Sequence, residues 1–342
     1  MNFRSCFIKE WTVQAIRDYF IARNFHEVET PILLTQVPLE PNLFTMKTRW
    51  HKRNIDFCLA TSPESSLKKL ITQGIGNCFA ISKVFRDLED IGPTHNLEFS
   101  MLEWYEMDKD YKHIAKTTED LVLTTYHKVL KSLKLPKSNI LVYQGKEIDL
   151  TPPWHCFTLQ ELFEKFAHMD LSQNLDTKNI IATAKAKGYE TERIAAWEPL
   201  YAQIFINEVE SHLPQDKPVF IFDYPTQQSP LCKPCSSTKG LALSEVEGFS
   251  QRYEFYIGGM EIGNAYTELT NSKVLEENFK KEEEFRKKNN LPSHPYDQEL
   301  VEATKNFPDC TGIGLGIDRL AMLFADTSNI EDVLYFPTSS LI

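Results

Sequence analysis

Residues 253–264 read Tyr-Glu-Phe-Tyr-Ile-Gly-Gly-Met-Glu-Ile-Gly-Asn. Apolar and polar side chains alternate on both sides of the Gly-Gly pair at 258–259, which predicts an antiparallel β-hairpin with a two-residue turn. Regular pairing across that turn puts Glu254 opposite Gly263, whose missing side chain leaves this part of the sheet open. It also puts Glu254 and Glu261 on one face as diagonal neighbours, about 7 Å apart.

Two carboxylates at this separation repel each other unless a positive charge lies between them. A hard divalent cation such as Mg²⁺ that also holds a phosphate suits this position, so Glu254 and Glu261 are the predicted metal ligands. The alternative is a sheet face that is open to water and carries two solvated glutamates. Glu268 is out of phase with the alternation, so it joins this face only if a bulge interrupts the strand.

Residues 84–105 predict two strands joined by a polar loop. Arg86 can bind a phosphate through two parallel hydrogen bonds, and His95 and Asn96 add donors where the loop ends. A glutamate beside the ring of Phe99 would suit a flat base with an exocyclic amine. The alternative is a surface hairpin with an ordinary salt bridge.

Residues 311–320 read Thr-Gly-Ile-Gly-Leu-Gly-Ile-Asp-Arg-Leu. Gly312, Gly314 and Gly316 remove the side chains from one face of a predicted strand, which allows a planar ligand to approach closely. Arg319 lies at the start of the following helix, where the helix dipole already favours anions. The spacing differs from the dinucleotide-binding fingerprint. A glycine-rich strand packed tightly on a helix is the alternative.

The rest of the chain predicts one α+β domain, in which an antiparallel sheet is flanked by helices and carries a helical insertion at about 112–215. Strands in neighbouring stretches of sequence can pair antiparallel, which favours this class. The expected helices are 11–23, 112–134, 271–289 and the segment from 318 onward, and 135–215 is mixed but mostly helical. The expected strands are 25–30, 79–85, 97–105, 218–223, 253–257, 260–264 and 312–317.

The chain has 342 residues, with 37 Lys and Arg against 48 Asp and Glu, so its formal net charge is −11. A surface this acidic disfavours extensive contact with a nucleic-acid backbone. No apolar run is long enough for a signal peptide or a membrane span. We therefore expect a cytoplasmic protein that makes no contact with membranes.

The seven cysteines are an odd number scattered along the chain, so they do not form a disulfide framework. Cys232 and Cys235 resemble half of a zinc site, but no second pair with this spacing follows. Two free thiols are therefore the expected state of this loop.

Together these stretches resemble the catalytic domain of class II aminoacyl-tRNA synthetases, and the lysine branch in particular. Residues 14–33 resemble motif 1, 83–105 motif 2 and 312–323 motif 3. Residues 259–269 resemble the lysine-type segment. The resemblance implies ATP and Mg²⁺ as cofactors, lysine as substrate, and a homodimer built on motif 1.

Lysyl-tRNA synthetases carry an oligonucleotide-binding barrel before this domain, but here motif 1 begins within the first two dozen residues. We therefore expect a single catalytic domain over 1–342 without an N-terminal anticodon-binding domain. Residues 61–64, 101–105 and 307–310 resemble the stand-alone elongation factor P lysine ligases, which attach (R)-β-lysine to a lysine of that translation factor.

This closer resemblance implies ATP-dependent activation of lysine or (R)-β-lysine and its transfer to elongation factor P, with tRNA an unlikely acceptor. Two alternatives stay open. One is a truncated synthetase that charges tRNA or a small carrier, and the other is a non-catalytic regulator with a synthetase-like fold.

The resemblance also implies a role for each matching residue. Arg86 and Arg319 are the catalytic cations, on the α- and γ-phosphate, and Glu89 accepts from the adenine amine. The implied ATP-binding residues are Arg86, Glu89, His95, Asn96, Phe99, Glu261, Ile262, Gly316 and Arg319. The implied amino-acid pocket comprises Ser62, Pro63, Glu64, Glu103, Tyr105, Asn264, Glu268 and Gly314, with Glu268 facing the terminal ammonium. Glu254 and Glu261 are the implied Mg²⁺ ligands.

Overall fold

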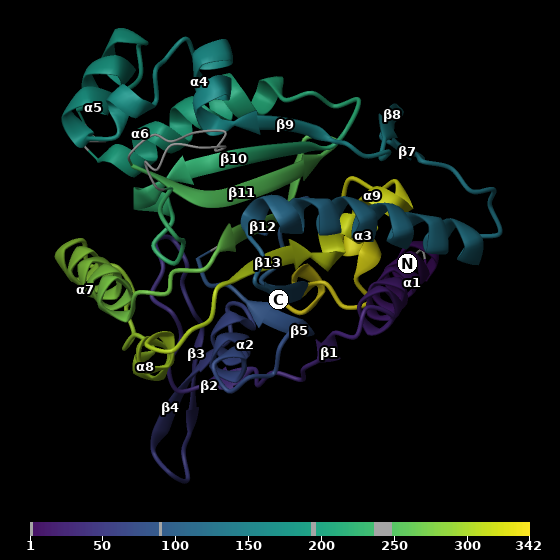
Figure 1. Ribbon diagram of the computed structural model, residues 1–342, viewed down its shortest axis with the longest axis horizontal. Helices are drawn as coiled ribbons and strands as arrows, with labels where there is room; N and C mark the ends of the chain where they lie inside the picture. The colour runs from purple at the N-terminus through teal and green to yellow at the C-terminus, as the bar shows by residue number, and fades with distance from the viewer. Residues whose placement is uncertain (1–2, 89–90, 193–195, 236–247) are drawn as a thin grey trace.

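The computed structural model describes residues 3–88, 91–192, 196–235 and 248–342. An eight-stranded sheet in the order β1-β5-β6-β13-β12-β11-β10-β9 crosses the molecule (Figure 1). Its neighbours pair antiparallel except at the two edges, where β1–β5 and β10–β9 are parallel. The strands are β1 (His26–Glu27), β5 (Cys78–Phe85), β6 (Glu98–Met107), β9 (His155–Thr158), β10 (Val219–Pro225), β11 (Phe249–Ile257), β12 (Met260–Thr267) and β13 (Cys310–Gly316). This architecture confirms the predicted fold class.

Three helices cover one face of this sheet: α1 (Phe3–Ile21), α3 (Tyr111–Ser132) and α9 (Ile317–Ala325). Alternate residues of the central strands point into this layer, and Phe20 of α1 packs on Phe79 and Trp104 with ring centroids 4.9 and 5.2 Å apart. Burial of these large aromatic side chains stabilises the helix–sheet layer. The intervening residues of the same strands point to the opposite face, which is left for the site.

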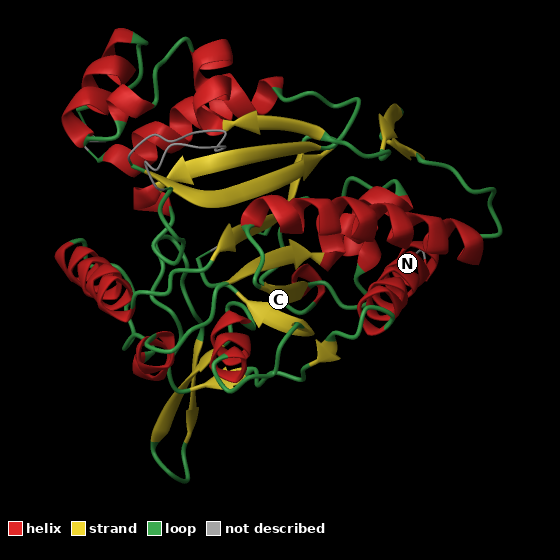
Figure 2. Ribbon diagram, in the orientation of Figure 1, coloured by secondary structure: helices red, strands yellow, loops and turns green. Residues whose placement is uncertain are grey.

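A second group of helices packs on the other face of the sheet, over β10 and β11 (Figure 2). It comprises α4 (Leu159–Ala167), α5 (Thr177–Ala186) and α6 (Trp197–Ile204). Thr158 and Glu161 form a capping box that fixes the start of α4. Helices make up most of the regular structure in 135–215 but fewer than half of its described residues, and the stretch also contributes β9 and the small sheet of β7 (Ile140–Tyr143) and β8 (Lys146–Asp149). Its description as an insertion into one domain stays a prediction.

The remaining elements lie around the open face of the sheet. Strands β2 (Leu33–Leu34), β3 (Lys47–Trp50) and β4 (Ile55–Leu59) form a three-stranded sheet, and the helices are α2 (Glu64–Ile71), α7 (Ser272–Lys288) and α8 (Gln298–Thr304). Short helical turns span Ser172–Asn174, Phe205–Val209, Glu210–His212, Thr226–Gln228, Ile330–Val333 and Thr338–Ser340. Within the described ranges, no helix has the length and apolar character needed to cross a membrane.

The register of the β11–β12 hairpin differs from the regular pairing that we expected. Glu254 lies opposite Asn264, and Gly263 lies opposite Phe255, because Ile262 is an extra residue that forms a bulge. Ile262 is buried in the helix-covered core, and burial of this side chain favours the bulge. Gly263 therefore does not open the floor beside Glu254. A Cβ at Gly263 would lie 2.6 Å from Phe255 Cε1, so glycine is required for packing on the far face.

Candidate active site

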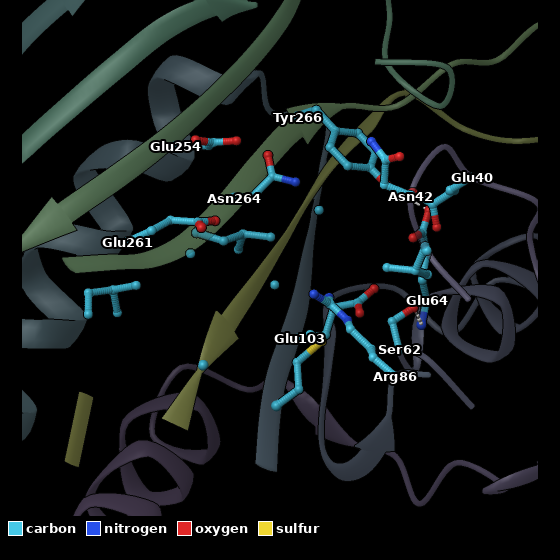
Figure 3. Close-up of a pocket in the computed structure, with 18 of the residues that line it drawn as sticks. Glu40, Asn42, Ser62, Glu64, Arg86, Glu103, Glu254, Glu261, Asn264 and Tyr266 are labelled. Carbon is cyan, nitrogen blue, oxygen red and sulfur yellow. Dashed lines mark hydrogen bonds between the residues drawn. The ribbon is translucent and has the colours of Figure 1, made fainter. Parts of the chain in front are cut away.

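A cavity of about 480 Å³ lies on the open face of β6, β11, β12 and β13 (Figure 3). The loop at 40–43 and residues 228–232 also line it. Most of the predicted site residues meet here: Ser62, Glu64, Arg86, His95, Asn96, Phe99, Glu103, Tyr105, Glu254, Glu261, Ile262, Asn264, Gly314, Gly316 and Arg319. Gly312, Gly314 and Gly316 of β13 also line the cavity, and the predicted approach of a planar ligand to them stays a prediction.

Two predicted residues in the described part of the chain, Pro63 and Glu268, are not among those that line the cavity. Pro63 is the N-cap residue of α2. Glu268 is buried behind the floor, 1% exposed. Glu89 lies outside the described residues. The roles assigned to these residues stay predictions.

The two predicted metal ligands, Glu254 and Glu261, lie on the same side of the cavity (Figure 3). Glu254 accepts hydrogen bonds from the hydroxyls of Tyr224 and Tyr256, at 2.7 and 2.9 Å, and from the Arg252 guanidinium at 2.6 Å. Desolvation in the cavity, and then the charge of Glu254, raise the pKa of Glu261 to about 7. The two carboxylates thus repel each other as we expected, but Arg252 supplies part of the positive charge that offsets this repulsion.

Arg319 ties the start of α9 to the motif 2 loop and to the hairpin. Its Nε donates to the Thr94 carbonyl at 3.2 Å, and a second nitrogen lies 2.8 Å from His95 Nε2. Its third nitrogen donates to the Glu261 carbonyl at 2.9 Å and lies 3.6 Å from the Glu261 carboxylate. A cation is therefore held next to the acidic pair, where it can neutralise a bound phosphate.

Arg86 and Phe99 lie together on neighbouring segments of the cavity wall. The Arg86 guanidinium carbon is 5.2 Å from the centre of the Phe99 ring, within the range of a cation–π contact. Asn96 is buried and engaged, because its amide nitrogen donates to the Glu98 carbonyl and its oxygen accepts from the Thr338 amide. Asn96 therefore shapes the end of the loop as well as lining the cavity.

The opposite side of the cavity is acidic. It holds Glu64 at the start of α2 and Glu103 on β6. The Tyr266 hydroxyl donates to Glu64 at 2.6 Å, and the Tyr105 hydroxyl donates to Glu103 at 2.7 Å. Burial, and then the charge of Glu64, raise the pKa of Glu103 well above its ordinary value. A region with this many buried carboxylates can bind amines.

The chain matches the family of class II tRNA synthetases (D, K and N) over residues 4–340. It belongs to this family. The lysine–tRNA ligase of Thermoanaerobacter pseudethanolicus is 33% identical over 330 residues, which cover 95% of this chain and 62% of the relative. That of Erwinia tasmaniensis is 32% identical over 332 residues, covering 96% and 62%. That of Saccharolobus solfataricus is 32% identical over 340 residues, covering 97% and 64%.

The chain thus spans a little under two thirds of the length of these relatives. They carry the name of a ligase, so the resemblance to the class II synthetases and to their lysine branch is confirmed at the level of the family.

Three charged residues in or next to the cavity were missed in the sequence. Arg252 lies two residues before Glu254 on the same strand face, and Lys68 lies one helical turn after Glu64, so both spacings carried a signal. Glu40 also lines the cavity, and burial followed by the charge of Glu64 raises its pKa to about 7. Its loop has no regular periodicity, so the sequence pattern held no comparable signal for it.

The thiols at Cys232 and Cys235 are unbonded to each other. Cys235 Sγ lies 3.8 Å from Asp223 Oδ1, and burial raises the pKa of both thiols. Within the described ranges, no three His, Cys, Asp or Glu side chains are grouped so that they could hold a metal ion.

Proposed function

We propose that this chain uses ATP to convert lysine or (R)-β-lysine into an aminoacyl-adenylate and transfers the aminoacyl group to a lysine of elongation factor P. The observation that carries this proposal is one cavity with two different sides. One side has Arg319 next to Glu254 and Glu261, and the other is rich in carboxylates around Glu64 and Glu103. The first side suits a metal-bound triphosphate, and the second suits the amines of a diamino acid.

The chemistry requires no nucleophile from the protein. An oxygen of the lysine carboxylate attacks the α-phosphorus of ATP, the bond from that phosphorus to the bridging oxygen breaks, and pyrophosphate leaves. Arg86 and Arg319 stabilise the negative charge that develops on the phosphates and orient them for in-line attack. The acceptor amine then attacks the carbonyl carbon of the adenylate, and AMP leaves with the electron pair of the broken C–O bond.

The residues present fit a Mg²⁺ ion at the first side of the cavity. Glu254 and Glu261 would hold it through carboxylate oxygens, which are the ligands that this ion prefers, and ATP phosphates and water would complete its coordination. When bound, Mg²⁺ neutralises phosphate charge. The hydrogen bonds from Tyr224, Tyr256 and Arg252 fix the orientation of Glu254 for this purpose.

Two features support a protein acceptor in place of tRNA. The net charge of −11 opposes broad contact with a phosphate backbone. The segments 61–64, 101–105 and 307–310 resemble the stand-alone ligases. Because the relatives reported above are lysine–tRNA ligases, tRNA is the second candidate acceptor.

A transfer assay separates these acceptors. The chain is incubated with ATP, Mg²⁺ and radiolabelled lysine or (R)-β-lysine, and either elongation factor P or lysine tRNA is added. We expect label on elongation factor P with the unchanged chain and no label with Glu261→Gln. Label on tRNA alone would contradict the proposed acceptor, and the absence of label on both acceptors would favour the non-catalytic regulator.

We also propose that the chain forms a homodimer through α1. Large aromatic side chains are exposed on α1 and near the last residues of the chain: Phe3 is 54% exposed, Phe7 44% and Phe336 79%. Phe3 packs against both Phe7 and Tyr335, with ring centroids 6.3 and 6.2 Å apart, so Phe3, Phe7 and Tyr335 form one aromatic surface. A surface of this kind suits self-association about a two-fold axis.

A further inference from the structure

A buried lysine lies at the acidic side of the cavity, where we expected only the ammonium of the substrate. Lys68 belongs to α2, and its side chain is 6% exposed. Its Nζ forms ion pairs with Glu64, one turn earlier in the helix, and with Glu268 Oε2 at 2.6 Å. Lys68 also lies 5.2 Å from the centre of the Tyr266 ring. One protein cation therefore joins α2 to the end of β12.

The two carboxylate oxygens of Glu268 have different surroundings. Oε2 is engaged by Lys68, whereas Oε1 is buried and has no hydrogen-bond partner among the described residues. Oε1 lies 2.9 Å from the position that a Cβ would take at Gly312, and Gly312 lines the cavity. The Tyr105 ring lies closer still to that position, with Cε1 2.4 Å away, so glycine at 312 lets the Tyr105 ring and this oxygen pack against the same wall of the cavity. A buried carboxylate oxygen without a donor is costly, so a ligand that donates to it would bind favourably.

The groups around Lys68 are mostly acidic. A single ammonium cannot balance the nearby carboxylates if all of them are ionised, so the cluster favours a second cation. Titratable groups from several elements act on Lys68 and Glu268. They are Glu40 in the 40–43 loop, Glu64 on α2, Glu103 and Tyr105 on β6, Cys232 in the 228–232 segment, Tyr266 on β12 and Cys310 on β13.

We propose that Lys68 is a positioning residue of the amino-acid pocket. It holds Glu268 by Oε2 and leaves Oε1 directed at the floor of the cavity beside Gly312, where an ammonium group of the diamino-acid substrate binds. Lys68 itself does not touch the substrate. The inference rests on the proposed function, since it assumes that a diamino acid occupies this cavity.

Substitution of Lys68 tests its positioning role, and substitution of the neighbouring Lys69 serves as the control. Lys68→Met should raise the KM for lysine at least about tenfold in ATP–pyrophosphate exchange, with a much smaller change in kcat, because the carboxylate that binds the amine loses its counter-ion. Lys68→Arg should recover most of the loss. Lys69→Met is the matched control, because Lys69 lies on the same helix but pairs with Asp297 and Glu299. Its KM should stay within about twofold of the unchanged chain.

The pH dependence of the KM for lysine separates a positioning role of Lys68 from a purely structural one, because loss of a structural contact would leave this dependence unchanged. Burial raises the pKa of Glu268 to about 8, and the charge of Lys68 opposes this increase. Amine binding needs the ionised carboxylate, so the KM for lysine should fall as pH rises from about 6.5 to 8.5. Loss of Lys68 removes the opposing charge, and the fall should move to higher pH. An unchanged pH profile in folded Lys68→Met would overturn the proposal.

A double-mutant cycle with Glu268→Gln keeps the proposal testable if Lys68→Met is unstable. If Lys68 acts through Glu268, adding Lys68→Met to Glu268→Gln should leave the KM for lysine almost unchanged. The double variant has neither of the two buried charges, so it should fold even if Lys68→Met alone does not. Additive effects would overturn the proposal. Absence of exchange by the unchanged chain would instead overturn the proposed function. Circular dichroism and thermal melting establish that each variant is folded.

Discussion

Arg252 links Glu254 to strand β12 and to the 228–232 segment of the cavity wall through three hydrogen bonds. Its guanidinium donates to Glu254 at 2.6 Å, to the side-chain oxygen of Asn264 at 2.8 Å and to the Gln228 carbonyl at 2.7 Å. It also lies over the Tyr224 ring, 4.6 Å from its centre. The planar guanidinium satisfies all these partners at once, which a lysine ammonium at this position would not do.

Arg252→Met should therefore reduce both activity and stability. Glu254 would be left buried without its counter-ion, a change that costs about 3–5 kcal/mol. Urea unfolding should show a loss of that size, and ATP–pyrophosphate exchange should fall at least tenfold, roughly the loss for one misplaced ligand. Arg252→Lys should recover part of the stability but little exchange. Wild-type exchange by Arg252→Lys would show that the guanidinium geometry is unimportant.

Gly314 has space for a small side chain on the cavity wall. The nearest atom to a Cβ at this position is Met101 Sδ at 3.6 Å, an ordinary contact distance. Gly314→Ala should therefore fold normally and narrow the amino-acid pocket. One methyl group changes discrimination by about 1–3 kcal/mol, so the ratio of kcat/KM for lysine to that for (R)-β-lysine should change at least about fivefold. An unchanged ratio would place the amino acid away from this wall.

At the scale of elements, the charged residues of α7 do not all face the solvent. Its i,i+4 ion pairs are present, but Arg286 is fully buried. The Arg286 guanidinium donates to the carbonyls of Glu40, Leu43 and Pro292 and lies over the Phe44 ring. This side chain fastens α7 to the loop whose residues 40–43 line the cavity.

Arg286→Met should loosen that loop. Several buried carbonyls would lose their donor, so the free energy of unfolding should fall by about 3 kcal/mol or more. The KM for lysine should rise at the same time, because the 40–43 loop forms part of the cavity wall. Lys287→Met, at an exposed neighbour that pairs with Glu283, should change stability by less than about 0.5 kcal/mol. Equal effects of the two substitutions would refute the role of Arg286.

The hairpin shows how far the sequence pattern leads and where it stops. Alternation and the Gly-Gly turn correctly predicted β11, β12 and the shared face of Glu254 and Glu261. The bulge at Ile262 shifted the partner of Glu254 by one residue, since core packing of one isoleucine competes with regular pairing. The same bulge provides the change of phase that Glu268 needs.

Buried cations were the main part of the site that pattern alone did not provide. Charged residues are interpreted as surface residues by default, because burial of an unpaired charge is costly. Lys68, Arg252 and Arg286 are exceptions that depend on partners distant in the sequence, such as Glu268 for Lys68 and the Glu40 carbonyl for Arg286. Only the folded structure brings those partners together.

For the whole molecule, the exposed aromatic surface of α1 leads us to expect a homodimer in solution. The chain should elute as a particle of twice its mass of 39.6 kDa in light scattering coupled to size exclusion. Phe7→Asp should shift it toward the monomer, because a charge in an apolar interface is strongly unfavourable. Leu135→Asp is the control at another exposed apolar side chain, 48% exposed, and should leave the mass unchanged. A monomeric unchanged chain would contradict the proposed dimer.

The overall negative charge of the molecule and the local basic groups in its cavity serve different purposes. Arg86, Arg252 and Arg319 lie around the cavity although the chain as a whole carries −11. This arrangement suits a small anionic ligand in a confined site better than a long phosphate backbone across the surface. The alternating strands make it possible, since one face of the sheet forms the core and the other the cavity.

Amino-acid-dependent exchange between ATP and labelled pyrophosphate tests adenylate formation most directly. The unchanged chain with Mg²⁺ and either lysine or (R)-β-lysine should return label to ATP, and Glu254→Gln and Glu261→Gln should reduce this exchange at least about a hundredfold. Exchange that is absent with both amino acids, or that persists in both glutamine variants, would contradict the account of this cavity as an adenylate-forming site.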